Sequence, residues 1–210
     1  MGTLAVAAKI THVPSMYFSE IDGPCKSKRQ AAIAGHHDID RRCRALGVDT
    51  IVVLDTHWLV NADHHINCAP HWKGAYTSNE LPYFISNLPC ALDVNPGLGQ
   101  LMAEVATACG VFTRAHPVTT LAPEHGTLVP MRMLPEYAAK GHGEGFMHNT
   151  AMLLGALGWN HYIRGVEVVA PFSPGSGTAQ INAVFPVSPM PTDLQGIGRP
   201  GAPTLAGLRL

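Results

Sequence analysis

The chain has 210 residues, which is long enough for one domain with a substantial hydrophobic core. Hydrophobic residues make up 46% of it and charged residues only 14%, and 14 Lys and Arg against 15 Asp and Glu give a formal net charge of −1. This composition argues against a disordered chain and against nucleic-acid binding, and no segment reaches the ~20 apolar residues that a membrane span needs.

The first half of the chain predicts a strand, a helix and a second strand. An apolar run over Leu4–Ile10 leads into polar residues and a proline, which is typical of a buried strand that enters a loop. Apolar and small residues at spacings of four and three predict a helix over Lys28–Leu46, with Gly47 as its stop. Thr50–Leu54 predicts the second strand, and a polar segment that contains His57 follows it.

A capping side chain and a proline predict the start of a later helix. Asn95 and Pro96 begin it, and Gly110 stops it after Cys109. Further elements are predicted as a strand over Val111–Ala115, a helix over Met147–Leu157, and strands over Val166–Ala170 and Ile181–Phe185. Strands that alternate with helices predict an α/β fold, in which one central sheet, mixed or largely parallel, is flanked by helices.

The last part of the chain differs in composition from the rest. Residues 188–210 are rich in proline and glycine and show no apolar period, so we expect a flexible tail there. We therefore expect a single domain over residues 1–187.

The cysteines and the N-terminal segment indicate the cellular compartment in which we expect the protein. The five cysteines are scattered without a Cys-x-x-Cys pair, which favours reduced thiols. The N-terminal apolar run is too short for a signal peptide and follows no basic segment. The sequence therefore predicts a soluble, cytoplasmic protein.

Histidine is the unusual residue of this composition, because the chain has 12 of them. His12 and His57 each follow a predicted strand, at the strand ends where ligands bind in α/β sheets. Glu144 stands in a glycine-flanked loop, Gly141–Gly145, before a predicted helix. Two imidazoles and one carboxylate form the facial triad of non-haem Fe(II) oxygenases. Each residue alone also fits an ordinary structural role, as a hydrogen-bonding histidine or as a favourable charge at a helix start.

Several longer segments resemble one enzyme family. They are KITHVPSM (9–16), DTHWLVN (55–61), HINCA (65–69), YTSNELP (76–82), GTLVPMR (126–132), LPEY (134–137), GEG (143–145), LLG (153–155) and SGTAQINAVFP (176–186). They are similar to the class III extradiol ring-cleavage dioxygenases, above all to members that open homoprotocatechuate (3,4-dihydroxyphenylacetate). The likeness covers nearly all of residues 1–187.

The resemblance implies a site and an activity. By it, His12, His57 and Glu144 correspond to the metal ligands, and the metal is Fe(II), with Mn(II) as an alternative. The implied reaction is extradiol cleavage of a catechol by dioxygen, here 3,4-dihydroxyphenylacetate to 5-carboxymethyl-2-hydroxymuconate semialdehyde, in the degradation of aromatic compounds. Family members commonly assemble, so we also expect a homo-oligomer.

The resemblance further indicates that a block is missing. In the family, several tens of residues separate the segments that here meet at Met133 and Leu134, and the usual acid–base histidine lies in that block. His125 and His116 are the histidines that we expect near the substrate instead, with an ordinary loop role as the alternative for each. Arg132 is a candidate partner for the substrate carboxylate, against the alternative of a solvated surface residue.

Two other interpretations of the residues stay open. A truncated chain could be an inactive or unstable remnant that binds a metal, because loss of core elements exposes apolar surface and unpaired strand edges. Two histidines and a glutamate also serve catalytic Zn(II), so a zinc-dependent hydrolase on the same ligands is the other alternative.

Overall fold

The computed structural model describes residues 3–55, 57, 62–79, 82–118, 123–131, 139–143, 166–175 and 178–187. Several predictions lie outside these residues and stay predictions: the ligand Glu144, the substrate partner Arg132, the helix over Met147–Leu157, the tail over 188–210 and the junction between Met133 and Leu134. The described chain contains both helices and strands, and the predicted α/β class is confirmed.

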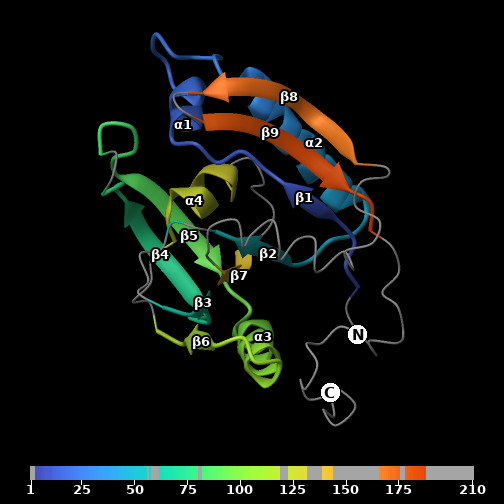
Figure 1. Cartoon of the computed structure of the whole chain (residues 1–210). Helices are drawn as coiled ribbons and strands as arrows, with labels where there is room; N and C mark the ends of the chain where they lie inside the picture. The colour runs from blue at the N-terminus through green and yellow to red at the C-terminus, as the bar shows by residue number, and fades with distance from the viewer. Residues whose placement is uncertain are drawn as a thin grey trace.

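Figure 1 shows the helices and strands in their order along the chain. The first seven are β1 (Ala7–Lys9), α1 (Ser15–Glu20), α2 (Gln30–Ala45), β2 (Ile51–Leu54), β3 (His64–Asn67), β4 (His71–Tyr76) and β5 (Leu88–Asp93). They are followed by α3 (Pro96–Ala108), β6 (Thr113–His116), α4 (His125–Met131), β7 (Ala139–Gly143), β8 (Glu167–Gly175) and β9 (Thr178–Phe185).

The two long helices, α2 and α3, begin and end close to where the sequence predicts. Asn95 caps α3, because its Oδ1 accepts a hydrogen bond from the Leu98 amide at 3.0 Å, and Pro96 occupies the first turn. Gly47 and Gly110 follow α2 and α3 with φ of 64° and 81°, a left-handed conformation that glycine adopts without strain. Both helix predictions are therefore confirmed.

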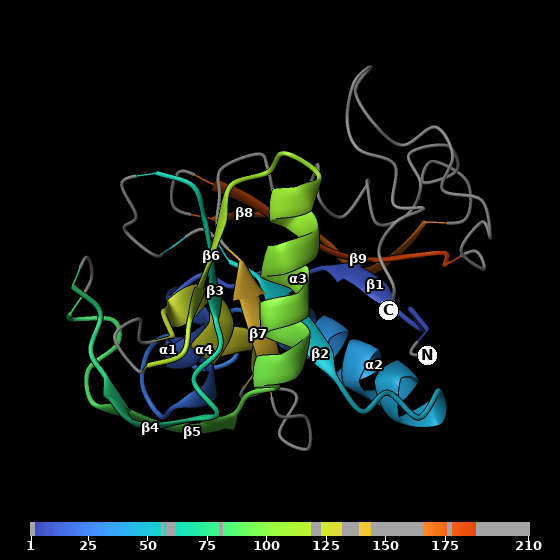
Figure 2. The same cartoon turned by 90° about the horizontal axis from the view of Figure 1, so that it is seen from below.

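The strands pair as four small sheets in the described part of the chain, which differs from the one central sheet that we expected. β2 pairs with β7 in parallel, and β3 pairs with β6 in parallel. β7 also contacts β3, so the four strands lie in the order β6, β3, β7, β2 (Figure 2). No ladder joins β3 to β7 among these residues. The central layer is thus split into two hydrogen-bonded pairs.

A three-stranded antiparallel sheet, in the order β1, β9, β8, brings together strands from opposite ends of the described chain. Ala7 of β1 lies opposite Phe185 of β9, and α2 packs against β8 and β9 (Figure 1). At Gly35 of α2 a Cβ would lie 2.8 Å from Asn182 Nδ2 and 2.9 Å from Ala170 Cβ. Only glycine allows the helix to approach the sheet this closely.

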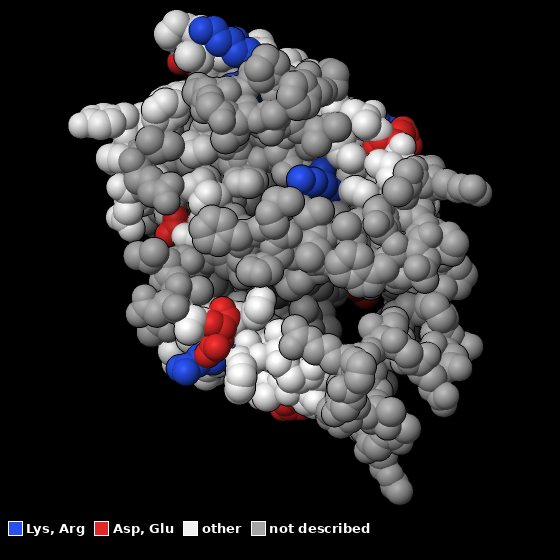
Figure 3. Space-filling view, in the orientation of Figure 1, with Lys and Arg blue, Asp and Glu red and all other residues white. Residues whose placement is uncertain are grey.

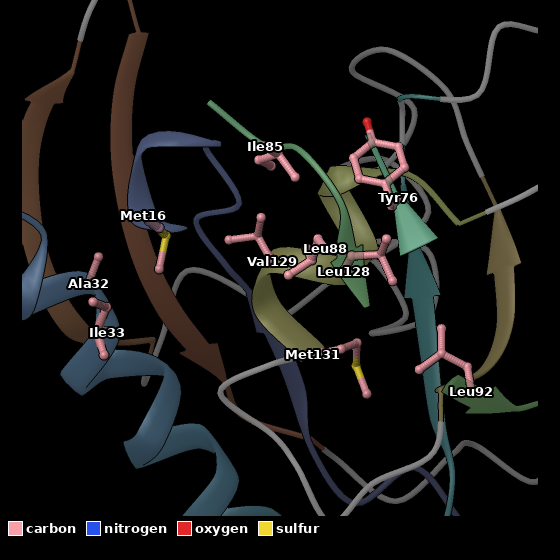
Figure 4. Close-up of a cluster of buried hydrophobic side chains, with 10 residues drawn as sticks. All are labelled: Met16, Ala32, Ile33, Tyr76, Ile85, Leu88, Leu92, Leu128, Val129 and Met131. Carbon is pink, nitrogen blue, oxygen red and sulfur yellow. The ribbon is translucent and has the colours of Figure 1, made fainter. Parts of the chain in front are cut away.

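The main hydrophobic core includes side chains of α1, α2, α4 and the β4–β5 hairpin (Figure 4). Its buried members are Met16, Ala32, Ile33, Tyr76, Ile85, Leu88, Leu92, Leu128, Val129 and Met131. Every residue of α4 is buried, although the helix contains Gly126 and Pro130, which both disfavour helices. Because α4 begins at His125, packing of this core also fixes the place of that histidine.

The loop that we expected over Gly141–Gly145 is wrong in its first part, because residues 141–143 lie in β7. Parallel pairing of β7 with β2 outweighs the weak strand propensity of its glycines. Glu144 follows directly after the end of this strand.

Two observations concern the surface and the membrane. Among the described residues, no helix has both the length and the apolar character needed to cross a membrane. On the face shown in Figure 3, the described Lys and Arg side chains stand in separate groups, some of them beside acidic side chains. The described part of this face therefore carries no continuous basic stripe.

Candidate metal centre

Three histidines from different parts of the chain meet in one place. His12 lies in the loop after β1 and His57 in the segment after β2, and their Nε2 atoms are 2.9 Å apart. His125, the first residue of α4, brings its ring centroid to 3.9 Å from that of His57 and 6.1 Å from that of His12. One possible ligand atom from each of the three lies within 4.8 Å of the others. We call these residues the three-histidine cluster.

The donor atoms of this cluster fit a divalent transition-metal ion. Neighbouring nitrogen ligands on an ion with bonds of about 2.0–2.1 Å are about 3 Å apart, and the Nε2 atoms of His12 and His57 are 2.9 Å apart. Their ring planes make an angle of 66°, so the rings meet at their edges and are not stacked. Imidazole nitrogen suits Fe(II) and Zn(II) alike. The cluster could therefore hold one ion of either kind.

Burial keeps two of these imidazoles neutral. Desolvation lowers the pKa of His12, and the adjacent His57 lowers it further, against the opposing effects of the Asp55 charge and a hydrogen bond to the Ile10 backbone. Burial, with His57 and His12 nearby, lowers the pKa of His125 to about 3. Neutral imidazole is the form that binds a metal ion or accepts a proton. Both side chains are in that form at pH 7.

A buried asparagine holds the backbone beside His12. Asn182 of β9 accepts a hydrogen bond from the Thr11 amide at 2.6 Å through Oδ1, and its Nδ2 donates to the Ala32 carbonyl of α2 at 2.9 Å. Its side chain is fully buried, so water does not compete for these bonds. One amide group thereby ties the loop that carries His12 to α2 and β9.

A buried carboxylate holds the backbone at His57. Asp55 Oδ1 accepts a hydrogen bond from the His57 amide at 3.1 Å, and Oδ2 accepts one from the Thr127 hydroxyl at 2.8 Å. Thr127 lies two residues after His125 in α4. Asp55 therefore joins the segment after β2 to the helix that carries the third histidine.

A tyrosine and a glutamate lie beside His125. The Tyr76 hydroxyl donates a hydrogen bond to Glu124 Oε2 and lies 3.5 Å from His125 Nδ1. Burial, and then the bond to Glu124, raises the pKa of Tyr76, so its hydroxyl stays protonated at neutral pH. Polar groups thus extend from Glu124 through Tyr76 to the cluster.

The structure separates the two histidines that we expected near the substrate. His125 lies in the three-histidine cluster. His116 instead ends β6, and its Nε2 is 2.7 Å from Nδ1 of His65 on β3. The structure therefore brings His116 to His65 and not into the cluster.

Three residues of this region were not singled out from the sequence. Asp55 stood next to His57 in the polar segment after β2, and this adjacency was an available signal. Asn182 stood in a segment that resembles the family, which marked the segment but not the residue. Tyr76 also stood in such a segment, but its contact with residue 124 depends on the fold.

Comparisons with known proteins point in one direction. The sequence model of a family described as the catalytic LigB subunit of aromatic ring-opening dioxygenase matches residues 6–138. The chain is also 57% identical, over 136 residues, to 3,4-dihydroxyphenylacetate 2,3-dioxygenase of Escherichia coli. That alignment covers 65% of this chain and 49% of the relative, so the chain spans about half the length of the curated relative that it matches. The region matched by the family contains all three clustered histidines.

Proposed function

The chain belongs to the LigB family of aromatic ring-opening dioxygenases, and we propose that it opens a catechol ring beside its two hydroxyl groups with dioxygen. The observation that carries this proposal is the convergence of His12, His57 and His125 within the region that the family matches. Such a site offers both metal ligands and a neutral base, which are the two things that this reaction needs from a protein.

We propose 3,4-dihydroxyphenylacetate as the substrate and 5-carboxymethyl-2-hydroxymuconate semialdehyde as the product. The identity of 57% to a relative that is named for this substrate supports the choice. Arg132 is the proposed partner of the substrate carboxylate, because its planar fork can donate two parallel hydrogen bonds to it.

The proposed metal is Fe(II), held by His12 and His57 with Glu144 as the third ligand. When bound there, the ion supplies a redox-active Lewis acid with open positions for the catechol and for dioxygen. The two histidines hold their nitrogen atoms at the separation that one ion needs. Mn(II) is the alternative metal for the same reaction.

We propose that His125 is the base that accepts and returns a proton in this reaction. Its ring lies against that of His57, and the negative charge of a bound catecholate would raise its lowered pKa, so that it can accept a proton from a catechol hydroxyl and later return it. The Tyr76 hydroxyl, 3.5 Å from Nδ1, helps to hold the ring in place. His125 thus takes the role of the histidine that this chain lacks.

The internal deletion between Met133 and Leu134 is part of the proposal. The segment LPEY follows directly after GTLVPMRM in the sequence, whereas the resemblance places several tens of residues between them. General acid–base residues contribute roughly 10²–10⁴-fold to rates. We therefore expect slower turnover than in a family member that keeps this block. By the same resemblance, we propose that the chain assembles into a homo-oligomer.

Ring opening by the full chain tests this function. The purified protein is loaded with Fe(II) without oxygen, and 3,4-dihydroxyphenylacetate and air are then added while oxygen uptake and the yellow product are recorded. His57→Ala is the negative control, and His71→Ala is the matched control, because His71 is exposed and pairs with Asp93. We expect product from the unmutated chain and from His71→Ala only.

Other outcomes separate the alternatives. Metal binding without product, together with hydrolysis by the Zn(II)-loaded chain, supports the zinc hydrolase. Absence of cooperative unfolding and of metal binding supports an unstable remnant. Product from His57→Ala contradicts the proposed site.

A further inference from the structure

Asp55 lies behind the three-histidine cluster and has no place in the reaction proposed above. We propose that this carboxylate is a positioning residue, which holds His57 and the start of α4 together so that their imidazoles face one metal ion. This inference rests on the proposed metal site, and it adds the residue that shapes it.

The contacts of Asp55 leave it little freedom. Each carboxylate oxygen accepts one hydrogen bond, from the His57 amide at 3.1 Å and from the Thr127 hydroxyl at 2.8 Å. The side chain is buried, at 9% exposure. A Cβ at Gly126 would overlap the carboxylate, so the α4 backbone packs directly against it. Asp55 is therefore enclosed by residues that immediately neighbour His57 and His125.

These contacts connect two parts of the chain that are far apart in the sequence. Thr127 and Asp55 are 72 positions apart in the sequence, and the bond between them is fully buried. This bond therefore ties the segment after β2 to the start of α4. Orientation of metal-binding imidazoles depends on such outer hydrogen bonds, and their loss typically weakens metal binding 10–100-fold.

The charge of Asp55 adds to its geometric role. A buried negative charge near neutral imidazoles favours a divalent cation beside them, because the low dielectric of the interior screens it weakly. The negative charge of Asp55 also acts on His12, because it raises the pKa of that residue against the lowering effect of burial. The carboxylate itself lies outside the group of atoms within 4.8 Å that could hold the ion, and both of its oxygens are engaged. It therefore acts through the histidines.

Two kinds of variant separate charge from hydrogen bonding. Asp55→Asn keeps the shape and removes the charge, and the Thr127 hydroxyl can rotate to accept from the new amide. Thr127→Val keeps the charge and removes one hydrogen bond, and Thr127→Ser restores that bond. The matched control is Asp93→Asn, which changes an exposed strand-end carboxylate that bonds to His71 at 2.8 Å.

The measurement is Co(II) binding to the metal-free full chain, followed by the visible absorption of the bound ion, with thermal unfolding of each apo variant as the record of folding. We expect the Kd for Co(II) to rise about 10–100-fold in Asp55→Asn and in Thr127→Val. Thr127→Ser and Asp93→Asn should bind within about threefold of the unmutated chain. If Asp55→Asn does not fold, the Thr127 pair decides alone.

Three results overturn the inference. Affinities of Asp55→Asn and Thr127→Val within about threefold of the unmutated chain would remove the positioning role. A loss in Asp55→Asn as complete as in His57→Ala, with Thr127→Val unaffected, would make Asp55 itself a ligand. An unmutated chain that binds no Co(II) defeats the inference as well. A chain that binds Co(II) in the expected order of affinities, yet opens no catechol with Fe(II), contradicts only the proposed function.

Discussion

The molecule contains two groups of close histidines, and they differ in what surrounds them. In the three-histidine cluster the closest nitrogen atoms are 2.9 Å apart, and in the pair of His65 and His116 they are 2.7 Å apart. The cluster has a third imidazole that is 3% exposed, with Asp55 behind it. The pair lies on the two-stranded β3–β6 sheet, and its rings are nearly parallel, with an angle of 13° and centroids 4.8 Å apart.

The neighbouring groups explain why a short distance between two imidazoles means different things in the two places. His65 Nε2 donates to the Ala62 carbonyl at 2.9 Å, so its Nδ1 carries the lone pair and accepts from His116 Nε2. The short distance in the pair is therefore an ordinary N–H···N bond. In the cluster, Nε2 of His12 faces Nε2 of His57 at a similar distance, but His125 offers a third possible ligand atom beside them and Asp55 bonds to the His57 backbone. The third imidazole and the buried carboxylate, rather than the short distance, mark the candidate metal site.

The largest expected effect tests this contrast directly. We expect His12→Ala and His57→Ala to lose Co(II) binding and ring opening entirely, because each removes a proposed ligand. His65→Ala should bind Co(II) like the unmutated chain. Isothermal titration of the four metal-free proteins measures their Co(II) affinity. Equal losses in all three variants would show that the three-histidine cluster and the histidine pair do not differ in metal binding.

The next effect concerns the third member of the cluster. We expect His125→Asn to keep Co(II) affinity within about tenfold while the rate of ring opening falls roughly 10²–10⁴-fold, because the proposed base is gone. His116→Asn should retain the rate. Single-turnover kinetics with Fe(II) measures both variants, and loss of metal binding in His125→Asn would turn this residue from a base into a ligand.

Packing around the cluster gives a stability effect. We expect Gly126→Ala to lower the free energy of unfolding by about 1–3 kcal/mol, because the new methyl group overlaps the Asp55 carboxylate. Gly97→Ala in α3 is the matched control, since its Cβ would lie 3.6 Å from Asn95 Oδ1, an ordinary contact. Urea unfolding compares the two, and equal stabilities would show that α4 does not pack tightly on Asp55.

The acid response of the metal-free protein should also come from the cluster. The pKa of His125 is about 3 in the folded chain and ordinarily 6.5, so the unfolded chain binds more protons between these values. The free energy of unfolding should therefore fall as the pH drops from about 6.5 toward 3, by up to about 1.4 kcal/mol per pH unit from this residue. His125→Asn should flatten the dependence, and a slope as steep as that of the unmutated chain would contradict this source.

The smallest effect belongs to the pair. We expect His116→Asn to lower the free energy of unfolding by about 0.5–1.5 kcal/mol, which is the usual net contribution of one hydrogen bond. Chemical denaturation measures it with Fe(II) absent. A larger cost would mean that the β3–β6 sheet depends on the pair for its pairing.

Local signals account for the parts of the fold that were predictable. The capping side chain of Asn95, the proline after it and Gly110 mark α3 without any knowledge of its surroundings. By contrast, β3 begins with two histidines and β4 contains Trp72, Lys73 and Gly74, so neither shows the apolar alternation of a strand. Their pairing depends on distant partners, which the sequence does not display.

The candidate site divides in the same way. The sequence made His12 and His57 candidates because each follows an apolar strand, and the resemblance indicated His125. The roles of Asp55 and Asn182 were not predictable, because each depends on a contact with a residue far along the chain. Thr127 is 72 positions from Asp55, and Thr11 is 171 positions from Asn182.

The bond between Thr11 and Asn182 also has a consequence for the order of events on the ribosome. At a translation rate of roughly 5–20 residues per second, Asn182 is made on the order of ten to thirty seconds after Thr11. Throughout that interval β1 lacks β9, its only ladder partner among the described strands, and its backbone groups are open to other chains. The nascent chain therefore carries His12, a proposed metal ligand, beside an unpaired strand, and this segment is where a chaperone would have the most to protect.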